Sequence, residues 1–426
     1  MRVLPIAAVG ALVAAGVVAR VWLGDAQSSA PAIETNPDAI ACPSATGCMS
    51  VGFSGSSYGV RVPFGAALAD GSWSLRMPPA PSAVVDSLLS SVDCTGADAC
   101  VAVGREDVPA PYLGARSAGD HPLIASWDGT TWVRASAPVP DGAKEARLNG
   151  VSCTGGACMA VGQYGRTADR DRLLASLWDG ETWKLLLPPR VRSSDDAALE
   201  GVDCVSATSC TAVGQFSYEL QELFSGVAPL VERWDGTAWR TEVSDNARDS
   251  LDTELNAVSC PTLEVCVAVG FQRRTGGTYA SFAEIREHGR WKILPTIDPP
   301  GSPDVELADV TCPAVDRCIA VGSWITGGSV RSLVESWDGT RWRIEETPTP
   351  PDATSVSLTA IDCNSPETCV VVGTTEQGSP TRHALSLTRT DGGWTVVPMP
   401  EPAGTSMSPT GALQSITASS APSSTT

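Results

Sequence analysis

The residues of this chain best suited to chemistry are its cysteines, which recur in pairs. The stretch VSCPTLEVCVAVG (258–270) places Cys260 and Cys266 six positions apart, between apolar residues typical of strands. All 14 cysteines of the chain belong to such pairs: Cys42 and Cys48, Cys94 and Cys100, Cys153 and Cys158, Cys204 and Cys210, Cys260 and Cys266, Cys312 and Cys318, Cys363 and Cys369. Paired thiols could bind a metal, carry out redox chemistry or form a disulfide.

We predict disulfides, because each of the other two uses lacks a requirement. Zinc needs four ligands within reach, usually from pairs of closer spacing, and the chain has only 3 histidines. A thioredoxin-like site would be C-x-x-C and would not recur along the chain. Even pairing at one repeated spacing in an exported chain is typical of disulfides. Bonded cysteines cannot serve as nucleophiles, and we expect no metal and no cofactor.

Tryptophans and aspartates also recur, in hairpin sequences such as WDGTTW (127–132). The tryptophans are Trp127, Trp132, Trp178, Trp183, Trp234, Trp239, Trp337 and Trp342. They could stack on sugars, but repetition at one register favours cross-strand pairs beside a tight turn. Most aspartates repeat as well, either in the turn, as Asp128 does, or before a cysteine, as Asp93 does. A glycosidase needs two carboxylates across a cleft. We interpret the repeated ones as structural and predict no catalytic residue.

One set of charged residues does not repeat in every copy. It occupies equivalent positions, or in one case the neighbouring position, ahead of the hairpin tryptophans: Arg61, His121, Arg172, Arg331 and His383. In a ring of repeats these cations would line one arc of one face. They could bind an anionic ligand such as a uronic acid, a phosphate or a carboxylate. The alternative is that they are solvated loop charges paired with nearby acids such as Asp120 and Asp171.

The cysteine and tryptophan signatures together define seven repeats of roughly 50 residues. Each repeat contains four short strand-like segments, and Asp-Gly before the last one is a strong hairpin signal. One four-stranded sheet cannot cover both of its faces, whereas stacked neighbours can. We therefore predict an all-β fold, a seven-bladed β-propeller of four-stranded blades with one disulfide per blade. We expect a C-terminal strand around Leu413, Ile416 and Ala418 to close the ring.

The ends of the chain predict export. Residues 1–26 combine Arg2, an apolar run and small residues, which indicates a signal peptide or, if uncleaved, a membrane anchor. We expect a linker over 27–36, the propeller over 37–419 and a disordered tail over 420–426. The protein would then lie outside the cell or in the cell envelope. It would touch a membrane only through its N-terminal segment.

The repeats resemble a family of exported actinobacterial propeller repeat proteins that carry the same Cys-pair and WDGTxW pattern. The resemblance covers about residues 37 to 400. The hairpin SWDGTTW (126–132) is also similar to the Asp-box of sialidase-type propellers and to kelch-like hairpins. Here, however, Asp128 and Gly129 are adjacent, where an Asp-box has a residue between them. The resemblance implies the fold and export, and it implies no sialidase activity.

Function is predicted from the surface that varies between repeats. The net charge of −19 repels phosphate backbones and argues against nucleic-acid binding. The connections between second and third strands vary most and carry aromatic residues: Tyr112, Tyr164, Tyr218, Phe224, Phe271 and Tyr279. We expect a monomeric, non-enzymatic module that binds an envelope protein or glycan through these loops. The alternative is a lyase or hydrolase acting on an anionic saccharide or small molecule.

Overall fold

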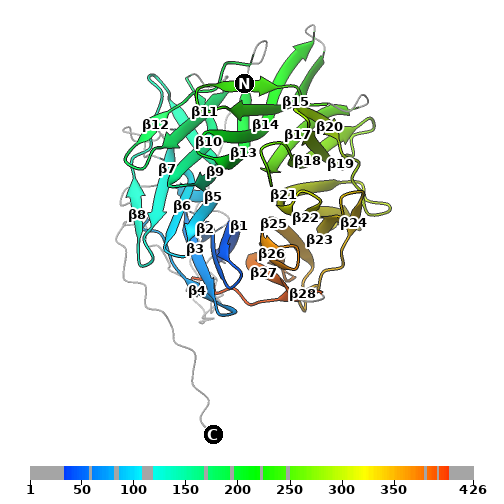
Figure 1. Ribbon diagram of the computed structural model, residues 1–426. Helices are drawn as coiled ribbons and strands as arrows, with labels where there is room; N and C mark the ends of the chain where they lie inside the picture. The colour runs from blue at the N-terminus through cyan, green and yellow to red at the C-terminus, as the bar shows by residue number, and fades with distance from the viewer. Residues whose placement is uncertain are drawn as a thin grey trace, which may run out of the picture. The chain divides into compact units, whose positions relative to one another are not determined.

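The computed structural model describes residues 33–56, 60–80, 86–107, 119–166, 171–191, 196–220, 224–245, 250–378, 381–390 and 393–402. Within these ranges the regular elements are all β-strands, labelled β1 to β28 in Figure 1. No helix that could span a bilayer occurs in this part of the chain. The predicted leader, the predicted C-terminal strand and tail, and Tyr112 lie outside the described residues.

Each repeat forms four consecutive strands. The first strands are β1 (Ile33–Ser44), β5 (Asp86–Gly96), β9 (Glu145–Thr154), β13 (Ala197–Ser206), β17 (Ser250–Ser259), β21 (Val305–Ala314) and β25 (Ser355–Ser365). The second strands are β2 (Gly47–Ser56), β6 (Ala99–Asp107), β10 (Ala157–Gly165), β14 (Ser209–Leu220), β18 (Cys266–Arg274), β22 (Arg317–Thr326) and β26 (Thr368–Glu376). The third strands are β3 (Arg61–Ala69), β7 (Asp120–Trp127), β11 (Asp171–Trp178), β15 (Phe224–Trp234), β19 (Tyr279–Glu287), β23 (Ser329–Trp337) and β27 (Arg382–Thr390). The fourth strands are β4 (Ser72–Leu75), β8 (Trp132–Ala135), β12 (Trp183–Leu185), β16 (Trp239–Glu242), β20 (Arg290–Ile293), β24 (Trp342–Ile344) and β28 (Gly393–Val396).

The strands pair antiparallel in chain order, and the sheets differ from the prediction in one respect. Five sheets have four strands, such as β1-β2-β3-β4, but the fourth and fifth repeats share one eight-stranded sheet. They are joined where β15 pairs in parallel with β17 at Val227 and Asp252. The backbone N–H of Val227 donates to Asp252 Oδ1 at 2.9 Å, which holds the two strands together there.

The N-terminal boundary also differs from the prediction. We expected a linker up to residue 36, whereas β1 already begins at Ile33. Thr35 and Asn36 are buried and pair with Ser54 and Phe53 of β2, so the strand extends through the predicted linker. The first sheet consists of the four strands β1 to β4 and ends at Leu75.

All seven predicted cysteine pairs are disulfide-bonded. Each bond joins the first strand of a repeat to its second strand at the hairpin turn. Cys153 and Cys158, for example, lie directly opposite each other in the register of β9 and β10. Their repetition in an oxidised form indicates an oxidising, extracellular compartment.

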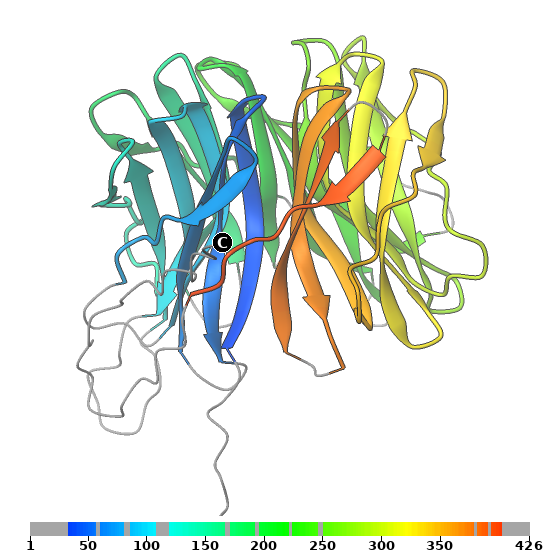
Figure 2. The same cartoon turned by 90° about the horizontal axis from the view of Figure 1, so that it is seen from below.

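The connections divide between two ends of the strands, which run up and down in Figure 2. The turns between first and second strands and between third and fourth strands form what we call the disulfide end. The connections between second and third strands, such as residues 275–278, form the loop end together with the segments that lead into the next repeat. This follows from the antiparallel pairing of every neighbouring pair within a repeat.

Apolar side chains of neighbouring repeats pack together and form the cores between adjacent sheets. Ala41 and Met49 of the first repeat pack with Leu89 and Trp127 of the second. The last repeat packs on the first in the same way, where Val372 and Met399 join a core with Phe64. Because both faces of each sheet are covered, a second strand such as β18 is buried at five successive residues rather than at alternate ones.

A glycine after each second-strand Val is required by a bulge in the neighbouring first strand. These glycines are Gly52, Gly104, Gly162, Gly214, Gly270, Gly322 and Gly373. A Cβ on any of them would lie 1.9 to 2.1 Å from a backbone carbonyl oxygen of the first strand. Opposite Gly270, the register shifts between Leu255 and Ala257, which makes Asn256 the extra residue of a β-bulge. The bulge turns Asn256 toward the centre of the arrangement.

Gly270→Ala should therefore destabilise the protein by about 1–3 kcal/mol, because the added methyl group meets the carbonyl oxygen of Glu254 at the bulge. Chemical denaturation followed by tryptophan fluorescence measures this change. Gly393→Ala is the matched control, since a Cβ there meets nothing within 4 Å. Equal stability of the two variants would contradict the requirement for glycine at the bulge.

Candidate functional site

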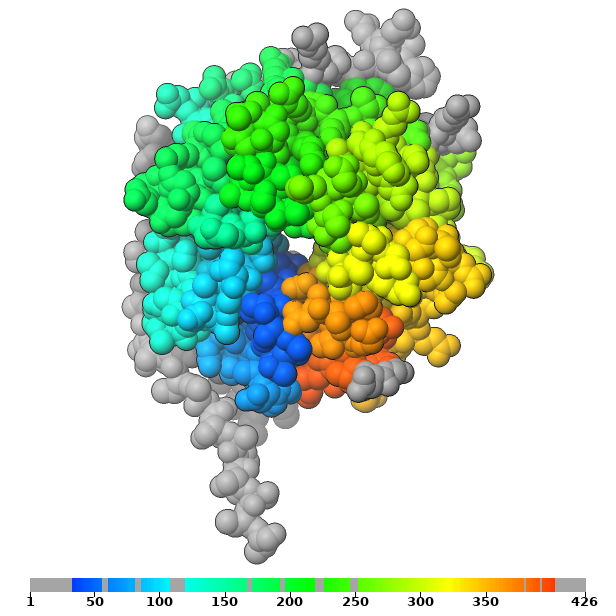
Figure 3. All heavy atoms as spheres, viewed as in Figure 1, coloured from blue at the N-terminus to red at the C-terminus, as the bar shows by residue number. Residues whose placement is uncertain are grey.

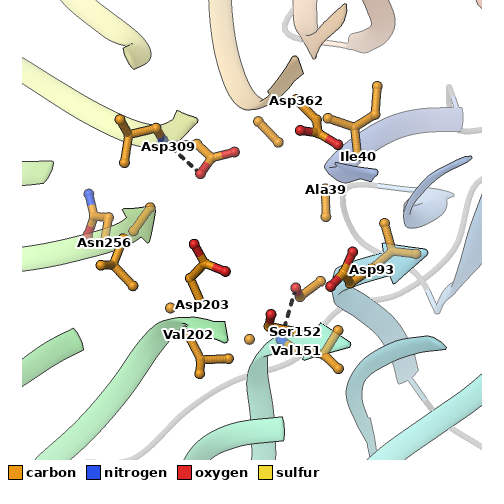
Figure 4. A pocket seen from close by; sticks show the side chains of 18 of the residues that line it. Ala39, Ile40, Asp93, Val151, Ser152, Val202, Asp203, Asn256, Asp309 and Asp362 are labelled. Atoms are coloured by element: carbon orange, nitrogen blue, oxygen red, sulfur yellow. Dashed lines mark hydrogen bonds between the residues drawn. The ribbon is translucent and has the colours of Figure 1, made fainter. Parts of the chain in front are cut away.

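A cavity of about 280 Å³ lies where the first strands of all seven repeats meet. It appears as an opening in the space-filling view of Figure 3. Its lining includes the bulged residues Asp38, Asn149, Glu200, Asn256 and Thr359. Figure 4 shows that the labelled aspartates of this cavity come from different first strands and point toward its middle. In this cavity, which we call the central channel, carboxylates from separate repeats lie close together.

Most of these carboxylates accept hydrogen bonds from the backbone of the next repeat. Asp93 Oδ2 accepts the N–H of Cys153 at 2.6 Å, and Asp203 Oδ2 accepts that of Cys260 at 2.6 Å. In two other repeats a serine occupies the same position, and Ser152 Oγ accepts the N–H of Cys204 at 3.1 Å. The prediction that the aspartate before the cysteine serves the repeat is therefore confirmed for these residues.

The last repeat makes the same contact with the first. Asp362 Oδ2 accepts the N–H of Cys42 at 2.7 Å. The Thr359 hydroxyl donates to the carbonyl of Pro37 at 2.6 Å, and the Asn364 amide donates to that of Cys42 at 2.6 Å. These bonds join residues separated by about 320 positions in the chain.

Burial controls the ionisation of the channel carboxylates. It raises the pKa of Asp309 to about 7, and that of Asp93 and Asp203 to about 6, although the backbone N–H bonds work in the opposite direction. Burial likewise raises the pKa of Asp38 to about 7, opposed by the charges of Arg61 and Arg382. A partly protonated carboxyl that also accepts backbone N–H groups is suited to holding sheets together rather than to attacking a substrate.

The predicted cationic residues lie at the beginning of the third strands of their repeats, as expected. Arg61 forms an ion pair with Asp86 of the next sheet, in which its Nε donates at 2.9 Å, and its backbone N–H donates to the same carboxylate. His383 Nδ1 lies 3.1 Å from Glu401. Two of the five cations thus have carboxylate partners, in keeping with the alternative of paired loop charges.

Arg172 lines a small cavity, whereas the other predicted cations lie elsewhere. This cavity of about 100 Å³ is formed by Arg172 with Tyr164, Leu187, Arg190 and further residues of the third repeat, and by Ala197 of the fourth. Arg61, His121, Arg331 and His383 do not line it. His121 is the second residue of β7 and is exposed, and Arg331 is a half-buried residue near the start of β23. The five cations therefore occupy similar positions on separate sheets, and Arg172 is the one among them that lines this cavity.

A larger pocket opens at the loop end, around the boundary between the fifth and sixth repeats. Its volume is about 380 Å³. We call it the loop-end pocket, and it is lined by Val227, Asp252, Glu254, Phe271, Tyr279, Asp304, Val305, Glu306, Ser323 and Ile325. These residues come from the beginnings of β15, β17, β19 and β21 and from the ends of β18 and β22. Six strands thus contribute to one concave site.

Two aromatic side chains form one wall of this pocket. Phe271 and Tyr279 lie on paired strands, and their ring centroids are 5.5 Å apart in an edge-to-face arrangement. The short connection between β18 and β19 is fixed by a hydrogen bond from the N–H of Arg274 to the carbonyl of Thr278. Its glycines, Gly276 and Gly277, have positive φ, which allows the tight turn. Tyr279 remains 38% exposed, so a ligand could contact its ring.

Four carboxylates surround these rings, and two of them are committed to structural bonds. Asp252 forms an ion pair with Arg273 at 2.5 Å, and Asp304 accepts the backbone N–H of Tyr279 at 3.1 Å. Glu306 accepts the Asn256 amide at 3.2 Å. The side-chain amide nitrogen of Gln215, in the orientation that lets it donate, lies 3.0 Å from Glu254 Oε1.

The pKa of Glu254 is raised to about 7, first by burial and then by the nearby carboxylates Glu200, Glu306 and Asp252. Burial also raises the pKa of Glu306. Sequence reasoning named Phe271 and Tyr279 but missed these two acids. The signal was present, since both precede the leucine of the first strand, in ELNAVSC (254–260) and ELADVTC (306–312).

The hairpin tryptophans are cross-strand pairs, as we interpreted them. Trp127 and Trp132 lie opposite each other with ring centroids 5.6 Å apart, and both are more than nine-tenths buried. The turn aspartate is structural too, because Asp128 Oδ1 accepts the backbone N–H of Thr130 and of Thr131. Buried rings of this kind offer no platform for a sugar.

Comparisons with known proteins support the fold. No protein-family model matches the chain, and no curated protein matches it. Among solved structures, two of a polysaccharide lyase described as PL25 ulvan lyase, one of them bound to -[GlcA(1-4)Rha3S]-, are 10% identical. They match with TM-scores of 0.55 and 0.54 over 83% of this chain and 94% of the lyase chain. A structure described as YCF48 bound to D1 peptide is 15% identical, with a TM-score of 0.42 over 74% of this chain and 81% of its own. The lyase likeness shows a propeller-like fold and nothing of this chain's activity.

The raised pKa values predict that stability falls as pH rises. Asp93, Asp203 and Asp309 bind protons in the folded state above pH 4, where the unfolded chain has released them. Their contribution is complete below about pH 4 and is lost as pH rises through 6 to 7. The turn aspartates, such as Asp128, have lowered pKa values and stay ionised in this range.

Denaturant titrations between pH 4.5 and 8 measure this dependence. We expect the free energy of unfolding to decrease with pH, most steeply between about pH 4.5 and 6, where the folded state holds protons that the unfolded chain has released, and to level off above pH 7. Asp309→Asn should make the dependence shallower, because the amide does not titrate. A stability that rises across this window, or an unchanged slope in the variant, would contradict the account.

Proposed function

We propose that this protein is an exported binding module of the cell envelope, a closed seven-bladed β-propeller that recognises an envelope protein or glycan at its loop end. Seven four-strand repeats and the bonds from the last repeat to the first, including Asp362 to Cys42, support the closed ring. The disulfides support export. Membership of the exported actinobacterial Cys-pair repeat proteins belongs to the same proposal and rests on the sequence signatures. We further propose that the protein acts as a monomer.

The observation that carries this proposal is the loop-end pocket. This pocket is concave, has a volume of about 380 Å³ and has an aromatic wall. It lies at the loop end, where the repeats differ most in sequence. Ligand sites in proteins are typically concave, largely apolar and provided with a few polar groups. The central channel is less suited, because Asp93, Asp203 and Asp362 already bind backbone N–H groups there.

The binding surface extends from this pocket over neighbouring exposed side chains. Ile325, at its edge, is 36% exposed, and Tyr279 is 38% exposed. Both belong to strands whose backbone is fixed by pairing, so the surface is held in place before a ligand arrives. Preformed surfaces of this kind bind without a large ordering cost.

An enzyme is a second candidate function, and one observation favours it. The pKa of Glu254 is raised to about 7, which would let its carboxyl group act as a general acid or base near neutral pH. Tyr279 lines the same pocket and could serve as its partner. A lyase or hydrolase acting on a saccharide or small molecule would then use the pocket that we assign to binding.

A pull-down from envelope extract, run beside a glycan array, tests the binding role. We expect Phe271→Ala/Tyr279→Ala to reduce capture by about tenfold or more, because aromatic residues in such pockets contribute most of the binding energy. Leu263→Ala is the control, since Leu263 is 48% exposed in the disulfide loop at the opposite end. Arg172→Ala/His383→Ala tests the cationic residues separately.

Equal capture by wild type and Phe271→Ala/Tyr279→Ala would overturn the assignment of the pocket. Loss of capture only in the Arg172→Ala/His383→Ala variant would transfer the site to the cationic residues. Each array ligand that binds is incubated with the protein and its products are analysed by mass spectrometry. Turnover that disappears in Glu254→Gln would establish the enzyme in place of the binding module.

A further inference from the structure

We propose that the loop-end pocket binds an organic cation, an ammonium group carried on an apolar stem, against the ring of Tyr279 and the carboxylates of Glu254 and Glu306. This inference rests on the proposed binding function and gives it a ligand chemistry. It differs from the sequence prediction, which expected an anionic ligand at the cationic residues.

The charges of the residues that line the pocket favour a cationic ligand. Asp252, Glu254, Asp304 and Glu306 line the pocket, and no lysine, arginine or histidine does so among the residues that the structure describes. Arg273 neutralises Asp252 from outside the lining. Within the described part of the chain, the partners of Glu254 and Glu306 are the amides of Gln215 and Asn256, which do not compensate the negative charge of these carboxylates when they are ionised. A cation in this pocket would compensate two carboxylates that lack an ion-pair partner among the described residues.

The aromatic wall of the pocket also favours a cation. Phe271 and Tyr279 stand edge to face, so the Tyr279 ring keeps a face that Phe271 does not cover. Cations are attracted to such a face when they lie within about 6 Å of the ring centre. Val227, Val305 and Ile325 supply apolar surface in the same cavity, which would contact the stem of the ligand rather than its charge.

The same arrangement disfavours anions. A uronic acid or phosphate placed here would lie beside Glu254 and Glu306, and none of the described lining residues is a cation that could receive it. The surrounding charge acts in the same direction, since the chain has a net charge of −19. This field attracts cations from solution and slows the approach of anions.

Two sources can supply this chemistry: a lysine side chain of a partner protein, and a free amine such as an amino sugar. Both present an ammonium group, but only the lysine carries it on a flexible chain of methylene groups. The apolar side chains of Val227, Val305 and Ile325 favour the lysine, because its methylene groups would contact them. Separate probes distinguish the two.

Isothermal titration calorimetry on the full oxidised chain at low ionic strength tests the proposal. The probes are n-butylammonium, with 1-butanol and butyrate as its uncharged and anionic counterparts. We expect saturable binding of n-butylammonium and none of the other two, and weaker binding at high salt. Nα-acetyl-lysine methylamide and glucosamine then compare the two sources, and we expect the lysine derivative to bind more tightly.

Glu254→Gln/Glu306→Gln should weaken n-butylammonium binding by about tenfold, because two partly exposed ion pairs are lost. Tyr279→Leu should weaken it as well while keeping the apolar volume. Glu264→Gln/Glu367→Gln removes the same charge from exposed positions at the disulfide end and should leave binding unchanged. Circular dichroism and denaturation verify that every variant is folded.

Absence of saturable binding, equal binding of butanol, or equal weakening by both double variants would overturn the proposal. Its failure is distinguishable from failure of the binding function. If partner capture depends on Phe271 and Tyr279 but is unchanged in Glu254→Gln/Glu306→Gln, the binding function stands and the cationic ligand is wrong. If capture is independent of the aromatic residues too, both are wrong.

Discussion

The hydrogen bond between the inner strand of one repeat and the cysteine N–H of the next is the interaction on which the rest of this structure depends. A four-stranded sheet has two faces, and neither is covered unless another sheet packs on it. The acceptors Asp93, Ser152, Asp203, Ser259 and Asp362 connect each of their repeats to the following one at a backbone N–H. The first repeat has Ala41 at this position, and its polar contacts with the second repeat include instead the ion pair of Arg61 with Asp86. The disulfide of the following repeat fixes the hairpin that presents the cysteine N–H group, as Cys153–Cys158 does for the bond to Asp93.

This constraint also decides where a ligand can bind. Carboxylates in the central channel are occupied by backbone groups and held partly protonated by burial, so their chemistry is used within the fold. A similar bond recurs at the loop end, where Asp304 accepts the N–H of Tyr279 and thereby orients a wall of the pocket. Glu254 and Glu306 are not used in this way. A ligand would therefore be bound by residues whose side chains are not used in the contacts between sheets.

Much of the fold could be predicted from the sequence, because its repeats carry separate physical signals. The cysteine spacing, the Asp-Gly turn and the continuous apolar strand each indicate one part of the four-stranded unit, and the structure has all three. The need for a glycine within each second strand could not be predicted, because it arises from the bulge in the neighbouring first strand, at Asn256 opposite Gly270. The join of β15 to β17 was not predictable either, because it depends on one Asp252 carboxylate reaching a neighbouring repeat.

The candidate site was predicted only in part. Phe271 and Tyr279 were recognisable as aromatic residues in a variable connection, but Glu254 and Glu306 lie in first-strand segments and were not singled out. Only the packing of adjacent repeats places them beside the aromatic pair. Arg61 shows the opposite case, since its ion pair with Asp86 of the next sheet could not be seen from its position in the sequence.

Hydrogen exchange of the backbone amides of Cys42, Cys153 and Cys260, resolved by NMR, tests the central claim most directly. Each amide donates to a carboxylate of the preceding repeat, and for Cys42 that repeat is the last one in the chain. If the sheets form a closed ring, the Cys42 amide should be as protected as the other two and exchange only with global unfolding. Rapid exchange of Cys42, beside slow exchange of Cys153 and Cys260, would show that the first and last repeats are not joined.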